Sequence, residues 1–267
     1  DVDVFDVRRN TGTFRHAVIR TPPRDSSASI VLNKSSPGKE EAEERIREYA
    51  RKTKAHNVLI TYVPPNRDVS VSEDFVVIKG QEWLREEYLG KTFWYHVQGF
   101  FQNNHEVAEK IHAHCLSLLQ KHKTPNAHLL DLYGGVGTFA IINADLFKGV
   151  TIVESSPLAV KAATRNIAEN SAPHVNPVLL DSKHLKRIDL PAPLFVIADP
   201  PRSGIHPRAL KRLKELKPEA IIYASCNARQ LQKDLSELPL YRIKSAALFD
   251  LFPQTPHIEA VVELVLA

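Results

Sequence analysis

The sequence predicts an α/β protein in which a doubly wound sheet with an antiparallel last strand follows a small α+β domain. Beyond about residue 128, short apolar runs alternate with helical patterns, which is typical of a parallel sheet with helices on both faces. The last two β-type runs, 241–249 and 260–266, are too close in sequence for a helical crossover, so we expect them to pair antiparallel.

Residues 1–92 are expected to form the small α+β domain. Gly, Pro and Asn turn signals separate four β-type runs, and one strongly charged helical stretch occupies 39–52. Its apolar stripe is narrow, which favours a solvated helix resting on a sheet; contact with RNA through Arg45, Arg51 and Lys52 is the alternative. The β-type runs are 13–19, 29–32, 58–63 and 75–78.

Residues 93–267 are expected to form the second domain. A strand-like run at 92–97 leads into a helix at 106–122, where Cys115 shares one face with Ile and Leu residues and is predicted to be core packing. Five further strands then alternate with four helices. The strands are 128–133, 150–154, 177–180, 194–198 and 220–224, and the helices are 138–147, 158–170, 207–216 and 228–238.

The composition limits the class of protein. The 267 residues are 43% hydrophobic, contain no apolar run of about 20 residues and do not begin like a signal peptide, so we expect a cytoplasmic protein without membrane contact. Two cysteines are too few for a four-cysteine iron–sulfur cluster or zinc site, and no metal site is predicted. The net charge of +4 permits a polyanionic partner.

Cys226 is the candidate nucleophile. It follows an apolar run at 220–224 that reads as a buried strand, and it precedes a helix with Asn227 as N-cap and Gln230 completing a capping box. Ligands bind at the carboxyl ends of such strands, and a helix N-terminus is expected to lower a thiol pKa. The alternative is that Cys226 is a small buried apolar residue.

A glycine-rich turn predicts a nucleoside cofactor site. Gly135 and Gly137 link a strand to a helix, and Glu154 ends the next strand, where its carboxylate can accept both ribose hydroxyls. The same pattern fits dinucleotide binding. Asp131 just before the glycines, and no evident hydride-transfer residues downstream, favour S-adenosylmethionine over NAD.

Asp199 ends the fourth strand of the second domain and is followed by two prolines and Arg202. The prolines force an extended exit that holds the Asp199 carboxylate at the carboxyl edge of the sheet. Enzymes that methylate exocyclic base nitrogens use a similar tetrapeptide with an aromatic fourth residue. Arg202 in that place weakens the N-methylation interpretation.

With these residues in hand, the chain resembles the RNA (uracil-5-)-methyltransferase family, the 5-methyluridine methyltransferases of tRNA and ribosomal RNA. Six motifs occur in family order over residues 92–267, and the preceding segment resembles the central domain of that family. The motifs are Phe100-Phe101-Gln102-x-Asn104, Asp131-Leu132-Tyr133-x-Gly135-x-Gly137, Glu154, Asp199-Pro200-x-Arg202, Ser225-Cys226-Asn227 and Phe252-Pro253-Gln254-Thr255-Pro256-His257-Ile258-Glu259.

The resemblance implies a class I S-adenosylmethionine-dependent methyltransferase with a Rossmann-like fold, with S-adenosylhomocysteine as a product. It implies that Cys226 attacks C6 of uracil and that Glu259 is the base. An antiparallel last strand would by itself bring Glu259 to the edge that carries Cys226. Contacts to the cofactor or the target base are implied for Gln102, Tyr133, Glu154 and Asp199, with Thr138 and Asp181 as further cofactor residues.

The expected partner is RNA, with tRNA favoured over ribosomal RNA, and the expected state is a monomer. Two family features are not found, the iron–sulfur cysteines of some members and the amino-terminal RNA-binding barrel. Either this member lacks the barrel or the chain has lost its amino-terminal portion, and the missing initial Met fits the second case. The alternatives are an RNA 5-methylcytosine methyltransferase, an inactive RNA-binding protein on a methyltransferase scaffold and, third, an NAD enzyme.

Overall fold

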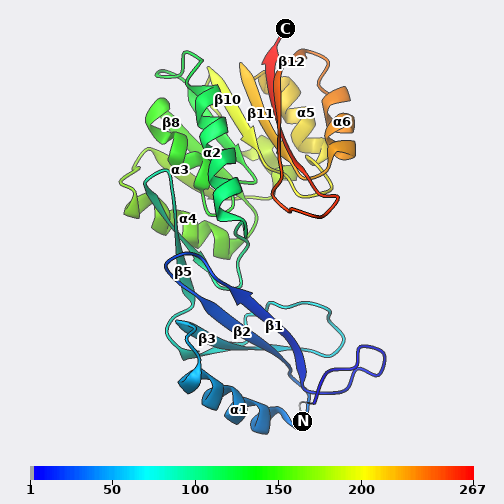
Figure 1. The fold of residues 1–267 in the computed structure, drawn as a ribbon. Coiled ribbons are helices and arrows are strands. Elements are labelled where there is room, and N and C mark those ends of the chain that lie inside the picture. Colours follow the sequence, from blue (N-terminus) through cyan, green and yellow to red (C-terminus); the bar gives the residue numbers. More distant parts are fainter. Residues whose placement is uncertain (1–2) are drawn as a thin grey trace. The chain divides into compact units, whose positions relative to one another are not determined.

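The computed structural model describes residues 3–267, which form two compact units (Figure 1). Unit 1 runs to Glu86 and includes Tyr95–Asn103, and unit 2 comprises Glu87–Trp94 and Asn104–Ala267. The chain passes between the units along a two-stranded sheet of β5 (Trp83–Tyr88) and β6 (Lys91–His96). The boundary predicted at residue 92 falls inside β6. In the described part of the chain no helix has the length and apolarity that a bilayer crossing requires.

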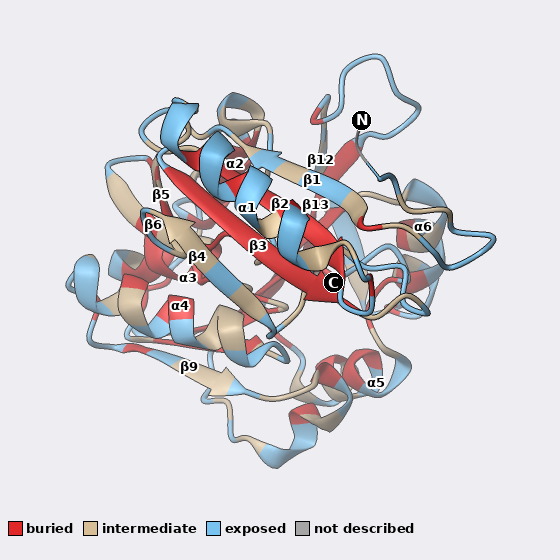
Figure 2. Ribbon diagram, turned by 90° about the horizontal axis from the view of Figure 1, so that it is seen from below, coloured by how far each residue is buried: buried red, intermediate tan, exposed pale blue. Residues whose placement is uncertain are grey.

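Unit 1 contains a four-stranded sheet in the order β1-β2-β3-β4. β2 and β3 are parallel, and α1 provides the crossover that a parallel pair needs. The apolar stripe of α1 buries Ala42, Ile46 and Ala50, and every residue of β3 is buried (Figure 2). The bounds are β1 (Phe14–Arg20), β2 (Ser27–Asn33), α1 (Lys39–Lys52), β3 (Asn57–Val63) and β4 (Phe75–Lys79).

Unit 2 contains a seven-stranded sheet in the order β12-β13-β11-β10-β7-β8-β9, with β13 antiparallel to both of its neighbours. This order confirms the predicted doubly wound sheet with an antiparallel last strand. The elements are α2 (His105–Leu119), β7 (His128–Leu132), α3 (Thr138–Asn143), η1 (Ala144–Leu146), β8 (Gly149–Glu154), α4 (Pro157–Glu169), β9 (Val175–Leu179), η2 (Ser182–Arg187), β10 (Leu194–Ala198), α5 (Pro207–Leu216), β11 (Ala220–Ser225), α6 (Ala228–Ser236), β12 (Tyr241–Phe249) and β13 (Glu259–Leu266).

Helices cover both faces of this sheet (Figure 1). On one face, η2, α5 and α6 enclose a core cluster that includes Leu185, Leu213 and Leu231 with residues from β7, β8, β10, β11 and β13. The helices α2, α3 and α4 lie on the other face, where Cys115 is fully buried, as predicted. Pro177 is tolerated inside β9 because β9 is an edge strand.

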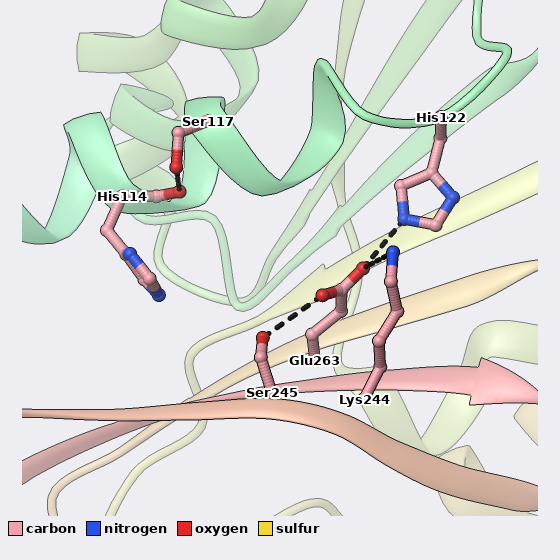
Figure 3. Close-up of polar contacts among 6 residues, drawn as sticks. All are labelled: His114, Ser117, His122, Lys244, Ser245 and Glu263. Carbon is pink, nitrogen blue, oxygen red and sulfur yellow. Dashed lines mark hydrogen bonds and ion pairs between the residues drawn. The ribbon is translucent and has the colours of Figure 1, made fainter.

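A buried carboxylate ties the antiparallel pair to the end of α2. Glu263 on β13 is 1% exposed, and its oxygens accept from Lys244 Nζ at 2.9 Å and Ser245 Oγ at 3.0 Å on β12 (Figure 3). His122 Nε2, just beyond α2, lies 2.8 Å from the same carboxylate. A buried charge needs such partners. The hydrogen bonds of Glu263 therefore hold β13, the strand that begins at Glu259, in place.

Candidate active site

The register of the sheet brings the predicted catalytic residues to one edge. Ser225 of β11 pairs with Ala260 of β13, so the next residues, Cys226 and Glu259, face each other where β11 ends and β13 begins. Ala198 is level with Leu132 and Tyr223 on the neighbouring parallel strands, which places Asp199 at the same edge. Glu259 reaches this position only because β13 runs antiparallel.

The turn that carries Cys226 is fixed on both sides. Ser225 Oγ donates to the Asn227 carbonyl and accepts from the Asn227 N–H, both at 3.2 Å. Asn227 Oδ1 accepts from the Gln230 N–H at 3.3 Å, which confirms Asn227 as N-cap, and Asn227 Nδ2 donates to the Arg202 carbonyl at 3.0 Å. The predicted capping box is wrong, because the Asn227 N–H donates to Ser225 Oγ and not to the Gln230 side chain. Cys226 is half-buried, unlike the core residue Cys115.

Electrostatics at this edge differ from the expectation for a helix N-terminus. Burial and the nearby carboxyls of Glu259 and Asp199 raise the pKa of the Cys226 thiol, against an opposite influence of Arg202. The prediction of a lowered thiol pKa is therefore wrong. Burial raises the pKa of Asp199 to about 7, and burial together with Asp199 raises the pKa of Glu259 to about 8. Two acids and a thiol that hold protons near neutral pH are suited to proton transfer.

The glycine turn lies between β7 and α3. Gly135 and Gly137 have φ of 53° and 87°, in the left-handed region that favours glycine. A Cβ on Gly135 would meet no atom within 4 Å, so open space lies over the turn. Glu154 Oε2 accepts from the Gly135 N–H at 3.1 Å, while Oε1 accepts from the N–H groups of Ser155 and Ser156 at 2.7 Å. Glu154, which is predicted to bind the ribose of the nucleoside, is thus held against the glycine turn by hydrogen bonds.

Asp131 lies beneath the same turn and is fully buried. One carboxyl oxygen accepts from the Ala140 N–H at 2.9 Å, and the other has no hydrogen-bond partner among the described residues. Burial raises the pKa of Asp131 to about 7. The unpartnered oxygen of Asp131, the Glu154 carboxylate and the open space over the glycine turn together fit a cofactor that has amino and ribose groups.

The other predicted cofactor residues are more occupied by protein contacts. The Tyr133 hydroxyl accepts from the His206 N–H at 2.9 Å, and Asp181 forms an ion pair with Lys183 at 2.7 Å. Thr138 is the first residue of α3 and is partly buried. Gln102 belongs to unit 1, so its cofactor role stays a prediction. Within residues 3–267, no group of three His, Cys, Asp or Glu side chains could hold a metal ion.

Sequence reasoning missed two asparagines that hold β6 on α4. The Asn166 amide pairs with both backbone groups of Trp94, at 2.7 and 3.0 Å, and Asn170 pairs with both groups of Thr92, at 3.0 and 2.7 Å. Asn166 Nδ2 also donates to the Val136 carbonyl inside the glycine turn, at 3.0 Å. The available signal was their spacing of four residues, about one helical turn, on a stretch predicted to be a helix.

A third missed residue, Asp234 of α6, secures the loop that follows Asp199. Its buried carboxylate accepts from the Ile205 N–H at 2.8 Å, the Tyr223 hydroxyl at 2.6 Å and the Gln230 amide at 2.8 Å. A Cβ on Gly204 would lie 2.4 Å from Asp234 Oδ2, so this approach requires glycine. The loop between Asp199 and Ile205 is therefore bound to the helix that follows Cys226.

The structure is similar to known structures over nearly its whole length. A tRNA (uracil-54, C5)-methyltransferase of Pyrococcus abyssi, solved with S-adenosyl-L-homocysteine, superposes with a TM-score of 0.79 at 27% identity, covering 99% of this chain and 63% of that one. A tRNA m1G37 methyltransferase of M. jannaschii gives 0.59 at 16% identity over 98% and 78%. The fold is that of the class I S-adenosylmethionine-dependent methyltransferases, as predicted.

Sequence comparison then identifies the family. The model of the tRNA (uracil-5-)-methyltransferase family matches residues 39–266. The 23S rRNA (uracil(747)-C(5))-methyltransferase RlmC of Escherichia coli is 32% identical over 208 residues, which are 78% of this chain and 55% of that protein. The chain belongs to the tRNA (uracil-5-)-methyltransferase family, and it spans about half the length of the curated relatives it matches.

Proposed function

We propose that this chain transfers a methyl group from S-adenosylmethionine to C5 of a uridine in RNA. The observation that supports the proposal is the register that brings positions 226 and 259 to the same edge of the sheet, where the Glu259 carboxyl, after burial, raises the pKa of the Cys226 thiol. Family membership favours uracil over cytosine and S-adenosylmethionine over NAD. When bound, the cofactor supplies an electrophilic methyl group. Asp131, Gly135, Gly137 and Glu154 are assigned to holding it, with Gln102, Thr138 and Asp181 as further contacts.

In this mechanism Cys226 makes C5 of the uracil ring nucleophilic. The thiolate adds to C6, and the electrons of the C5–C6 double bond move toward the C4 carbonyl, leaving an enolate whose nucleophilic carbon is C5. That carbon then accepts the methyl group. Covalent addition divides one difficult step into two easier ones. Because the pKa of the Cys226 thiol is raised in the free protein, the thiol must first give its proton to solvent, and the resulting thiolate then attacks C6.

Glu259 completes the reaction as a base. Its carboxylate removes the proton from C5, and the electrons of that C–H bond restore the C5–C6 double bond and expel the Cys226 thiolate. Burial raises the pKa of Glu259 and the neighbouring Asp199 raises it further; Asp199 is also assigned to contact with the target base or the cofactor. A stacked uridine must leave its stack to reach the thiol, as in other enzymes that modify a base.

Product analysis tests this function. The 267-residue chain is incubated with S-adenosylmethionine and either a tRNA transcript or a 23S rRNA transcript, and the nucleosides are separated by mass spectrometry. We expect 5-methyluridine, with tRNA the better substrate. Formation of 5-methylcytosine would support the cytosine alternative. Binding of both ligands without any methylated product would support an inactive RNA-binding protein.

The asparagine pair on α4 gives a separate prediction about cofactor binding. Asn166→Ala removes the donor to the Val136 carbonyl in the glycine turn, so the Kd for S-adenosylmethionine should rise roughly tenfold, the equivalent of one hydrogen bond. Asn170→Ala is the matched control, since it releases Thr92 without touching the turn. Calorimetric titration measures the Kd for S-adenosylmethionine, and thermal unfolding measures the stability of each variant. Equal changes in Kd for both variants would contradict this role.

A further inference from the structure

A group of basic residues lies on η2 and α5 of unit 2. Segment 181–217 has nine Lys and Arg against four Asp and Glu, a net charge of +5, whereas the whole chain has +4. The two elements themselves have seven cations and one acid, Glu215. By contrast, α1 in unit 1 has five of each sign. We call the seven cations the basic band: Lys183, Lys186, Arg187, Arg208, Lys211, Arg212 and Lys214.

The two elements that carry the basic band are packed on the hydrophobic core and joined to each other. Leu185 of η2 is buried in the same core cluster as Leu210 and Leu213 of α5, and Lys186 Nζ joins Glu215 Oε1 across the two elements at 3.2 Å. The opposite side of α5 is open to solvent (Figure 2). Packing of the buried leucines therefore fixes the backbone that carries the cations, of which Lys183, Lys186, Arg187, Arg208 and Lys211 are exposed.

Three of these cations have no carboxylate partner. Lys183, Lys186, Arg212 and Lys214 form ion pairs with Asp181, Glu215 or Glu237. Within residues 3–267, no ion pair holds Arg187, Arg208 or Lys211, and all three are exposed. Burial lowers the pKa of His184, and Arg187, Lys183 and Arg208 lower it further against the opposite influence of Asp181, so three of the cations lie near one imidazole. A solvated helix face usually mixes both signs evenly, whereas η2 and α5 have seven cations and one acid.

The position of the band relates it to the active site. η2 follows the carboxyl end of β9, and α5 follows the loop that begins at Asp199, so both elements start at the sheet edge that carries Cys226 and Glu259. Cations grouped at such an edge attract a polyanion and orient it before the chemical step.

We propose that the basic band is a docking surface for the phosphate backbone of RNA, placed to hold the strand whose uridine enters the active site. The inference rests on the proposed function for its choice of polyanion. Arg187, Arg208 and Lys211 are the principal contacts, because their charges are not neutralised by the protein. Phosphate contacts of this kind give affinity and position without reading sequence.

The test is the salt dependence of RNA binding. In the 267-residue chain, Arg187→Gln, Arg208→Gln and Lys211→Gln are combined, and the Kd for a fluorescent tRNA transcript is measured from low to high salt. We expect Kd to rise roughly tenfold or more near physiological salt, and the slope of log K against log salt to fall by about 2, since each phosphate contact contributes about 0.7 to 0.9. The KM for RNA should rise, while kcat at saturating RNA stays unchanged.

The matched control removes the same charge from the opposite edge of the sheet. Lys121, Lys123 and Arg242 are exposed there, and their combined replacement by Gln should leave both Kd and slope close to those of the unaltered chain. Equal weakening by the two triple variants, or no weakening by the first, would overturn the proposal. Methylation by the unaltered chain and its affinity for S-adenosylmethionine are measured separately. Failure of the proposed function can therefore be distinguished from failure of the docking proposal.

Discussion

Replacing Cys226 with alanine is expected to abolish methyl transfer, with a loss on the order of 10⁴-fold or more, as removal of a covalent nucleophile usually costs. Without the sulfur, C6 of uracil has no nucleophile and C5 does not gain the electron density that methyl transfer needs. The measurement is incorporation of labelled methyl groups into a tRNA transcript. The Kd for S-adenosylmethionine should change little, because Cys226 lies outside the glycine turn.

The covalent step has its own readout. RNA that contains 5-fluorouridine at the target should form a denaturant-stable adduct with the unaltered chain, since fluorine cannot leave C5 as a proton does, and Cys226→Ala should form none. The other cysteine provides the control: Cys115→Ala changes a fully buried residue, so it should lower stability by about 1 kcal/mol and still form the adduct. Normal turnover by Cys226→Ala would exclude the nucleophile assignment.

Replacing Glu259 with glutamine is expected to slow turnover by about 10² to 10⁴-fold, the usual contribution of a positioned base. The amide nearly matches the carboxyl in shape but cannot take the C5 proton, so addition and methyl transfer proceed while elimination stalls. A methylated RNA–protein adduct should therefore accumulate with ordinary uridine and be detected as a shifted band on a denaturing gel. Normal turnover without any adduct would refute the assignment.

The pH profile tests the same carboxyl in the unaltered chain. The pKa of Glu259 is raised to about 8, so the group is mostly protonated at pH 7 and gains its basic form as pH rises. The raised thiol pKa of Cys226 acts in the same direction. We therefore expect the single-turnover rate to increase from pH 6 to pH 9. A rate that is flat over this range would show that neither group needs to lose a proton there.

Much of the candidate site could be predicted because its signals are local. Residues 220–224 are apolar on every side and end at a polar turn, so the strand and the edge position of Cys226 follow from one stretch of sequence. Sequence reasoning missed β5, which has three consecutive charged residues between its apolar ends and buries Glu86, which hydropathy alone places outside. The predicted helix at 138–147 ends at Asn143 and continues as the 3₁₀ turn η1.

The sequence by itself determined the fold class, the antiparallel last strand and the set of residues at the catalytic edge, because periodicity and short motifs act over a few residues. Only the tertiary structure decided the protonation of those residues and the partners of their side chains. Burial raises the pKa of the Cys226 thiol, and Glu259 and Asp199 raise it further because folding brings these distant residues to the same edge. Likewise, the Tyr133 hydroxyl binds the His206 N–H, a contact 73 residues distant that no local pattern encodes.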